Sequence, residues 1–299
     1  MPGKKIAIIG GSGFIGSKLT EALLADGFEI TVVDLLPPRH ADSRVRFMQA
    51  NLATDHLDPN FLSGYYGIVN LAGATIGKRW NAAYKDLIYK SRIETTKAVV
   101  RAIGTAEVRP KVLVNASAAG YYGDQKSELL DESHAPGTDF LAHVCVDWER
   151  AATEAESLGV RVVRIRTANV LGPGGLLASL APLFKKGLGG YFGSGNQYMP
   201  WIHWTDIVGI YAYALKNESL SGAYNVGAGA CISQKKLFKA YARSIKMPIV
   251  WRVPRFAARI VIGEFADALI DSQNTSSKKI IDAGYAYKVD DVEKALRTL

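Results

Sequence analysis

The chain has 299 residues, of which 48% are hydrophobic and 21% charged, proportions typical of a globular protein with one large domain and room for a small appendage. Its 36 basic against 28 acidic residues give a net charge of +8, which suits small anionic ligands. The basic residues are scattered in short runs, so most are read as solvated surface and no nucleic-acid partner is predicted.

Cysteine usage and hydropathy indicate where the protein works. Two cysteines, Cys145 and Cys231, argue against a disulfide scaffold and fit a reducing compartment. The chain shows no signal peptide, and no apolar run approaches the roughly 18–20 residues of a membrane span. We therefore predict a cytoplasmic protein without a membrane partner.

A strand–turn–helix–strand unit spans residues 5–34. An apolar run predicts a buried parallel strand, and an amphipathic helix and a second apolar run follow. Between the first strand and the helix stand Gly10, Gly13 and Gly16. In such a unit the first glycine makes the tight turn, the second lets a diphosphate approach the main chain, and the third lets helix and strand pack closely. The helix N-terminus then faces the phosphates, so the unit predicts a dinucleotide site.

Asp34 ends the second strand, 18 residues after Gly16, about where a carboxylate accepts hydrogen bonds from an adenosine ribose. Arg39 follows in a proline loop, either near a 2′-phosphate or facing solvent as an ordinary loop cation. The carboxylate would repel a phosphate and favours NAD, whereas the arginine favours NADP. The residues leave both cofactors open, with a modest preference for NAD.

Strands continue to alternate with helices up to residue 170. Further strands are predicted at 45–48, 66–73, 112–117 and 161–166, and helices at 81–103 and 138–158. This rhythm predicts an α/β fold built on a doubly wound parallel (Rossmann) sheet, whose ligands lie beyond the carboxyl ends of the strands. The residues expected at those ends are Gly10–Gly16, Asp34, Asn51, Leu71–Gly73, Ser117 and Thr167.

Beyond residue 170 the rhythm loosens. We expect a loop at 171–175, a helix at 176–188, a helix at 207–216 that Asp206 caps, a short strand at 223–227, and mainly helices from 233 onward. The chain is therefore divided into an NAD(P)-binding Rossmann domain (1–170) and a smaller C-terminal substrate lobe (171–299), in which 248–299 is a helical extension.

Seven motifs together resemble the extended short-chain dehydrogenase/reductases, the group that contains the sugar-nucleotide epimerases, and within it an atypical epimerase-like branch. They are GGSGFIG at 10–16, NLAGATIGKRW at 70–80, SRIETT at 91–96, SAAGYYG at 117–123, VCVDWE at 144–149, VLGPGG at 170–175 and WIHWTDIV at 201–208. Residues 263–285 look like the extra helical piece of that branch. The resemblance spans nearly the whole chain.

The resemblance implies NADP or NAD along the crevice, with a lean towards NADP from which Asp34 departs. It carries over Phe14 and Ile15 with the three glycines as the phosphate turn, and Leu71, Ala72 and Gly73 as the wall beside the adenosine and ribose. It suggests that Ser117 and the turn from Thr167 to Val170 flank the nicotinamide. Asn51 and Leu52, after the third strand, complete the predicted cofactor residues together with Arg92.

The wider superfamily transfers hydride with a serine, a tyrosine and a lysine, the lysine lowering the pKa of the phenol. Aligned on the motifs above, those positions hold Ala118, Leu141 and Cys145. Tyr122 and Lys126 do stand four apart, but in a glycine-containing loop where they need not share a face. Ser117 and Tyr122 are the catalytic candidates that remain, Tyr122 because it is expected at a strand end facing the crevice.

Other candidates have a functional and a structural interpretation. Cys145 is a nucleophile or a small buried packing residue. His203 is an acid/base group or a hydrogen-bonded structural histidine. Arg92, near Arg79 and Trp80, meets a cofactor or substrate phosphate or lies on the helix surface. A polar or anionic substrate would find its pocket among Lys185, Lys186, Gln197 and Trp201, although for the two lysines a solvated helix face is the preferred interpretation.

Two functions follow from these residues. The first is an NAD(P)-dependent oxidoreductase or epimerase-like enzyme with non-standard acid/base residues, acting on a small molecule as a monomer or homodimer. The alternative is a catalytically silent NAD(P)H-binding sensor that docks a partner, which the missing serine, tyrosine and lysine favour.

Overall fold

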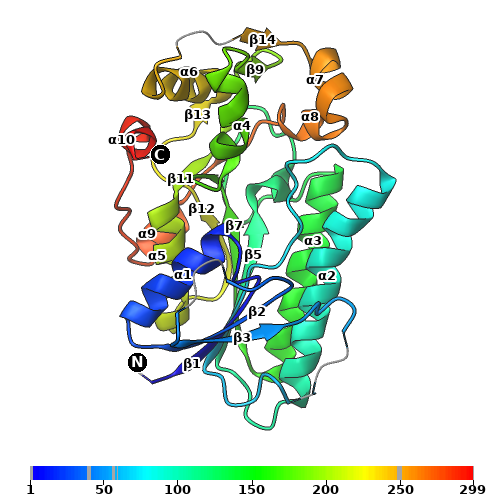
Figure 1. Ribbon diagram of the computed structural model, residues 1–299, viewed down its shortest axis with the longest axis vertical. Helices are drawn as coiled ribbons and strands as arrows, with labels where there is room; N and C mark the ends of the chain where they lie inside the picture. Colours follow the sequence, from blue (N-terminus) through cyan, green and yellow to red (C-terminus); the bar gives the residue numbers. More distant parts are fainter. Residues whose placement is uncertain (1–2, 39–41, 56–57, 59, 248–250, 299) are drawn as a thin grey trace.

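A seven-stranded parallel sheet forms the centre of the molecule. The computed structural model describes residues 3–38, 42–55, 58, 60–247 and 251–298. The strands lie in the order β12-β7-β5-β4-β1-β2-β3 (Figure 1). Their bounds are β1 (Lys5–Ile9), β2 (Glu29–Asp34), β3 (Val45–Gln49), β4 (Gly67–Asn70), β5 (Val112–Ala118), β7 (Arg161–Thr167) and β12 (Gly222–Val226). The order reverses between β1 and β4, which is where such sheets bind ligands.

Helices cover both faces of this sheet. Figure 1 shows α1 (Phe14–Ala25) and α5 (Trp204–Lys216) on one side and α2 (Ala82–Thr105) and α3 (Phe140–Thr153) on the other. Side chains alternate along each strand, so Ile6 and Ile8 share a core cluster with Leu19 of α1, whereas Ala7 and Ile9 share another with Val99 of α2. The strands are almost continuously apolar because helices cover both faces of the sheet.

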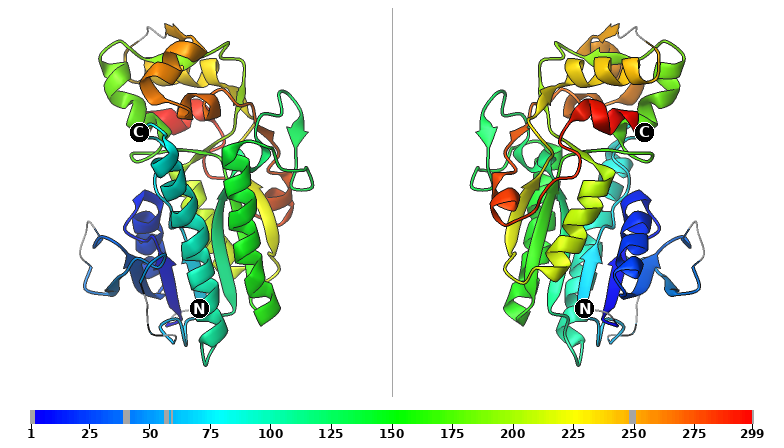
Figure 2. Two further views of the ribbon diagram at one scale, coloured as in Figure 1. Left: turned by 90° about the vertical axis from the view of Figure 1, so that its right-hand side faces the viewer. Right: turned by 90° about the vertical axis from the view of Figure 1, so that its left-hand side faces the viewer.

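The C-terminal lobe lies beyond the carboxyl ends of the strands, at the end of the molecule away from the N-terminus (Figure 2). It holds α4 (Leu176–Lys185), α6 (Gln234–Ser244), α7 (Arg255–Ile262), α8 (Phe265–Ala268) and short paired strands. The pairs are β8 (Asn169–Leu171) with β11 (Trp201–His203), β9 (Gly190–Phe192) with β14 (Trp251–Val253), and β10 (Tyr198–Met199) with β13 (Ile232–Ser233).

The last residues return to the sheet. β15 (Asn274–Thr275) pairs with β6 (Leu129–Leu130), and α9 (Lys278–Asp282) lies beside β12. α10 (Val292–Arg297) then packs on α6. The 3-10 helices η1 (Ala119–Tyr122) and η2 (Glu154–Leu158) follow β5 and α3. Among the described residues, none of the helices is both long and apolar enough to cross a membrane.

The predicted sheet and its helices are confirmed, whereas the predicted cap of α5 is wrong. The helix begins at Trp204, and its cap is His203, whose side chain accepts a hydrogen bond from Thr205 N. Asp206 lies in the first turn, fully buried, and its carboxylate accepts hydrogen bonds from Lys288 N at 2.8 Å and Val289 N at 3.0 Å. It therefore anchors the C-terminal segment. The boundaries 1–170, 171–299 and 248–299 stay predictions.

Candidate cofactor site

The three glycines of the first loop differ in what a side chain would meet. Gly10 has a φ of +75°, and a Cβ there would lie 2.8 Å from Ala72 N. A Cβ on Gly16 would lie 2.6 Å from Gly11 Cα. A Cβ on Gly13 would meet only Gly10 O, at 3.4 Å. The fold itself therefore requires glycine at positions 10 and 16, whereas the space above Gly13 is open.

The N-terminus of α1 faces the same space. Gly13 is its cap residue and offers no side chain to the first N–H groups, which therefore remain suited to an anion. The ring of Phe14 packs against two glycines of the loop between β8 and α4. A Cβ on Gly172 would lie 2.6 Å from this ring, and a Cβ on Gly174 would lie 2.5 Å from it. The VLGPGG motif thus lets the lobe close against the phosphate turn. Ile15 packs against the core beneath it.

Asp34 stands at the end of β2, beside the glycine loop. Its Oδ2 accepts a hydrogen bond from Ser12 N at 2.9 Å, and its Oδ1 accepts one from Leu35 N at 2.7 Å. The carboxylate therefore braces the phosphate turn in addition to any contact with a ribose. Arg39 lies outside the described residues.

The residues predicted to line the adenosine side belong to a turn and to the end of the strand β4. Asn51 Oδ1 accepts a hydrogen bond from Ala53 N at 3.2 Å, and Leu52 is buried in the core. Leu71 and Ala72 pass so close to Gly10 that their main chain forms one edge of the loop. Gly73 lies under the guanidinium of Arg92, whose Cζ would be 2.9 Å from a Cβ there.

Ser117, at the end of β5, belongs to a buried polar network rather than to an open site. Its Oγ donates to Glu149 Oε1 at 2.7 Å. The Glu149 carboxylate also accepts hydrogen bonds from Arg166 Nε at 2.8 Å and Arg166 Nη2 at 3.0 Å. Arg166 Nη1 in turn donates to Tyr122 Oη at 2.8 Å. The two residues predicted to be catalytic are therefore joined through an ion pair.

Tyr122 has a side chain with 0% exposure. Its hydroxyl donates a hydrogen bond that two acceptors share, Asp131 O at 2.9 Å and Asn225 Oδ1 at 2.8 Å. Burial raises its pKa to about 12, against the opposing effect of Arg166. This geometry favours a structural role and lends no support to the predicted contact with substrate. Lys126 bonds Asp124 and has a φ of 56°, so it forms no pair with the phenol.

The positions of the missing catalytic set are apolar or buried. Leu141 packs beside Gly120. Cys145 is 4% exposed, and burial raises its pKa to about 12, so the packing interpretation of Cys145 is confirmed. The structural interpretation of His203 is confirmed too, since it caps α5 and its Nε2 lies 2.9 Å from Thr298 Oγ1. Thr167 and Val170 lie in the strands β7 and β8, and both are half-buried.

The predicted substrate pocket is not formed as expected. Gln197 is buried, and its Nε2 donates to Phe192 O and Gln234 Oε1 within the lobe. Trp201 belongs to the lobe's core, because the short strand β11 runs through the interior. Lys185 and Lys186 are exposed at the end of α4. Trp80 packs between Phe140 and Phe265, each with ring centroids 5.5 Å away, and so joins domain and lobe.

Glu149 and Arg166 were not among the predicted site residues. Charged residues are rarely buried without a partner, but no local pattern marks these two as the buried ones. The helix α3 also contains Asp147 and Arg150, and the strand β7 contains two further arginines.

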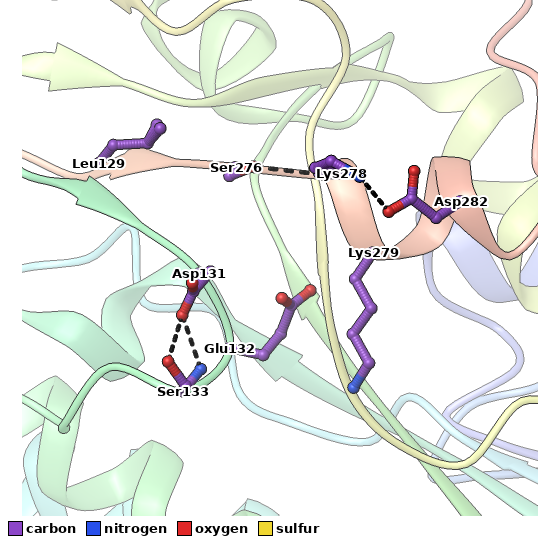
Figure 3. Close-up of a pocket in the computed structure, with 8 residues that line it drawn as sticks. All are labelled: Leu129, Asp131, Glu132, Ser133, Ser276, Lys278, Lys279 and Asp282. Carbon is purple, nitrogen blue, oxygen red and sulfur yellow. Dashed lines mark hydrogen bonds and ion pairs between the residues drawn. The ribbon is translucent and has the colours of Figure 1, made fainter.

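A separate cavity of about 690 Å³ lies between the turn after β6 and the start of α9 (Figure 3). Its charged groups already have partners. Lys278 bonds Asp282, Lys279 Nζ donates to Ala223 O at 2.7 Å, and Glu132 Oε1 accepts from Asn225 N at 2.7 Å. The lining residues are Leu129, Asp131, Glu132, Ser133, Ser276, Lys278, Lys279 and Asp282. The part of the chain that the structure describes holds no cluster of three metal-binding side chains.

Comparison with known proteins decides the family. The model of the NAD-dependent epimerase/dehydratase family matches residues 6–227, and a domain of unknown function, DUF1731, matches 253–299. The chain belongs to the NAD-dependent epimerase/dehydratase family. It is 38% identical to the epimerase family protein Mb2239 of Mycobacterium bovis over 97% of this chain and 96% of that protein.

Solved structures of this family share the fold. The human epimerase family protein SDR39U1 (isoform 2), crystallised with NADPH, is 29% identical, with a TM-score of 0.86 over 98% of both chains. A UDP-glucose 4-epimerase of Thermus thermophilus in complex with NAD has a TM-score of 0.77 at 24% identity, over 98% of this chain and 97% of that one, which shows the fold alone. The predicted family, the Rossmann sheet with its C-terminal lobe and an NAD(P)-dependent, epimerase-like character are confirmed.

Proposed function

We propose that this protein binds NAD(P)H in the crevice between β1 and β4 and uses it in an oxidoreductase or epimerase-like reaction on a small polar or anionic molecule. The observation that carries the proposal is the open space above Gly13, between two glycines that the fold itself requires. A ligand diphosphate accounts for the absence of a side chain there, because its oxygens need the main-chain N–H groups. The NADPH of the human relative supports the same assignment.

The proposed cofactor residues follow the crevice from the adenosine to the nicotinamide end. When bound, the nicotinamide supplies the hydride chemistry. The main chain at Gly13 and the first turn of α1 hold the diphosphate, and Asp34 sets the adenosine side. The residues proposed to line the rest are Asn51, Leu52, Leu71, Ala72, Gly73, Arg92, Ser117, Thr167 and Val170, with Arg39 as a candidate beside Asp34.

Proton transfer is the step for which this chain departs from the superfamily. Leu141 carries no acidic proton, and the buried thiol of Cys145 holds its proton, its pKa raised to about 12. Ser117 already donates to a buried carboxylate. We therefore propose a proton donor outside these three positions, on the lobe or on the substrate itself.

Gly13→Ala tests the cofactor site. We expect an unchanged fold, with a melting temperature within about 3 °C of the parent, and at least a tenfold loss of affinity for NADH and NADPH by calorimetry, about 1.4 kcal/mol or more. Gly77→Ala is the matched control, since a Cβ there meets only Thr75 Oγ1 at 3.7 Å. A Gly13→Ala protein that binds both dinucleotides as tightly as the parent would disprove the site.

The buried Tyr122 and the apolar Leu141 favour a second candidate function, a silent NAD(P)H sensor that docks a partner. A screen of carbonyl compounds and nucleotide sugars with NADH and NADPH separates the two functions. Turnover of any of them supports the enzyme, whereas tight cofactor binding without turnover supports the sensor.

We also propose that the protein acts in the cytoplasm as a monomer or homodimer. The free thiols of Cys145 and Cys231 support a reducing compartment, and light scattering of the purified protein would give its oligomeric state.

A further inference from the structure

Arg92 of α2 places its guanidinium at the end of β4. Its Cζ would lie 2.9 Å, and its Nη2 3.1 Å, from a Cβ on Gly73, so the planar group rests directly on that glycine. The guanidinium also lies over the Trp148 ring, with 5.2 Å from Cζ to the ring centroid. Nη1 donates to Ile88 O at 3.1 Å, within the same helix. The side chain is therefore held in one place, across the gap between α2 and α3.

Among the residues that the structure describes, no carboxylate forms an ion pair with this cation. Burial lowers the pKa of Arg92, and the groups that act on it electrostatically are Cys145 and Tyr84, neither of them a carboxylate. Arg166 differs in this respect, since its more deeply buried side chain, 4% exposed, bonds Glu149 through two nitrogens. Within the described residues, the half-buried Arg92 guanidinium makes a hydrogen bond only from Nη1, to Ile88 O, and its other N–H groups remain available for a charge-assisted bond. An acceptor from outside the chain would satisfy those groups, so the position indicates a ligand.

The order of the strands in the sheet indicates which part of a bound dinucleotide would lie near Arg92. β2 and β3 lie on one side of β1, and β4, β5 and β7 lie on the other. A dinucleotide with its adenosine at Asp34 and its diphosphate at Gly13 therefore has its second nucleoside at the ends of β4 and β5. Gly73 follows β4, and Cys145, the electrostatic neighbour of Arg92, bonds the main chain of Ala118 at the end of β5. The guanidinium lies between these two strand ends.

We propose that Arg92 binds the nicotinamide-side ribose of NAD(P)H, its N–H groups donating to the two neighbouring ribose hydroxyls. The inference rests on the proposed cofactor function and adds a positioning role to it, because the bonds would hold the nicotinamide at one depth in the crevice. The planar fork of a guanidinium suits two oxygens side by side, and hydrogen bonds from a charged donor are the stronger ones. The cation comes from α2, whereas position 145 of α3 contributes an uncharged thiol.

The test compares three ligands that differ at this ribose. NADH and ADP-ribose contain it, whereas ADP has the adenosine and the diphosphate but lacks this second ribose. For Arg92→Met we expect affinities for NADH and ADP-ribose to fall by about tenfold or more, in line with a lost charge-assisted bond, and the affinity for ADP to stay within about twofold. Arg101→Met, an exposed arginine on the same helix, is the matched control and should change none of the three.

Each other outcome overturns the inference. An equal loss for ADP would place Arg92 on the diphosphate or show a general distortion of the site. Unchanged affinities for all three ligands would leave Arg92 to the substrate or to the fold. If Arg92→Met does not fold, Arg92→Lys keeps the charge without the fork, and an affinity for NADH equal to that of the parent would contradict the role. Parent protein that binds none of the three would instead refute the proposed function.

Discussion

Glu149 and Arg166 form a two-point ion pair in the interior, with Nε–Oε1 at 2.8 Å and Nη2–Oε2 at 3.0 Å, and both side chains are 4% exposed. Ser117 bonds the carboxylate end and Tyr122 the guanidinium end. The pair ties α3 to β7, directly behind the crevice. Its removal should therefore disturb the scaffold of the site rather than its chemistry.

Glu149→Gln is expected to lower the free energy of unfolding by about 3–5 kcal/mol, because it leaves the Arg166 cation buried without a counter-charge. Urea unfolding followed by circular dichroism measures the change. The control is Asp86→Asn, which removes the exposed partner of Lys90 and should alter stability by less than about 0.5 kcal/mol. A Glu149→Gln protein as stable as the parent would show that the buried pair contributes nothing to the fold.

The sheet and the phosphate turn could be predicted because their information is local. A glycine's conformational freedom and the alternation of apolar residues are visible within residues 5–34, and the family motifs extend that prediction along the chain. The interior contacts of the site are not local. Tyr122 is buried by Asn225, 103 residues away, so a strand-end tyrosine that looks like a crevice residue can be turned inward by a strand much later in the sequence.

Asp206 and Gln197 also have hydrogen-bond partners that are distant in the sequence. An acid near the start of a helix reads as a cap, but the carboxylate of Asp206 binds backbone N–H groups of residues 288 and 289. Gln197 is satisfied by Gln234 and Leu269 O. Both partners come from the C-terminal lobe, whose irregular chain path no periodicity in the sequence describes.

Asp271 gives the protein a predicted dependence of stability on pH. Its pKa is raised to about 7, mainly by burial and then by Asp139, Asp124 and Asp267, with Arg255 opposing. The unfolded carboxyl titrates near pH 4. Between these values the folded state binds more protons, so this contribution to stability is complete below about pH 4 and lost as the pH rises through 7.

Asp271→Asn should therefore raise stability above pH 7 by about 1–2 kcal/mol, a figure reduced for the partial exposure of the group, and leave it unchanged near pH 4. Urea titrations at pH 4.5 and pH 8 would measure the two values. Equal effects of the substitution at both pH values would mean that Asp271 does not titrate abnormally.

Asp34 should discriminate between the two dinucleotides if its carboxylate faces the adenosine ribose. Asp34→Asn removes a charge that would repel a 2′-phosphate but keeps an acceptor for Ser12 N. We expect the ratio of NADPH to NADH affinity to rise by roughly tenfold, the effect of a nearby charge at a partly exposed site. Calorimetry with both cofactors measures the ratio, and Asp26→Asn, at a distant ion pair with Lys216, is the control. A constant ratio would remove Asp34 from cofactor selection.

Tyr122→Phe distinguishes a structural phenol from a catalytic one. The substitution keeps the ring but leaves Arg166 Nη1 only the longer bond to Glu132 O and deprives Asn225 Oδ1 of the phenol proton. This should lower the free energy of unfolding by about 1–3 kcal/mol. Affinity for NADH and NADPH should stay within about twofold, because the hydroxyl is directed away from the crevice into this network. Tyr121→Phe, which retains the ring under Arg166, should be nearly neutral. A Tyr122→Phe protein with undiminished stability but lost turnover or cofactor affinity would instead restore Tyr122 as a catalytic residue.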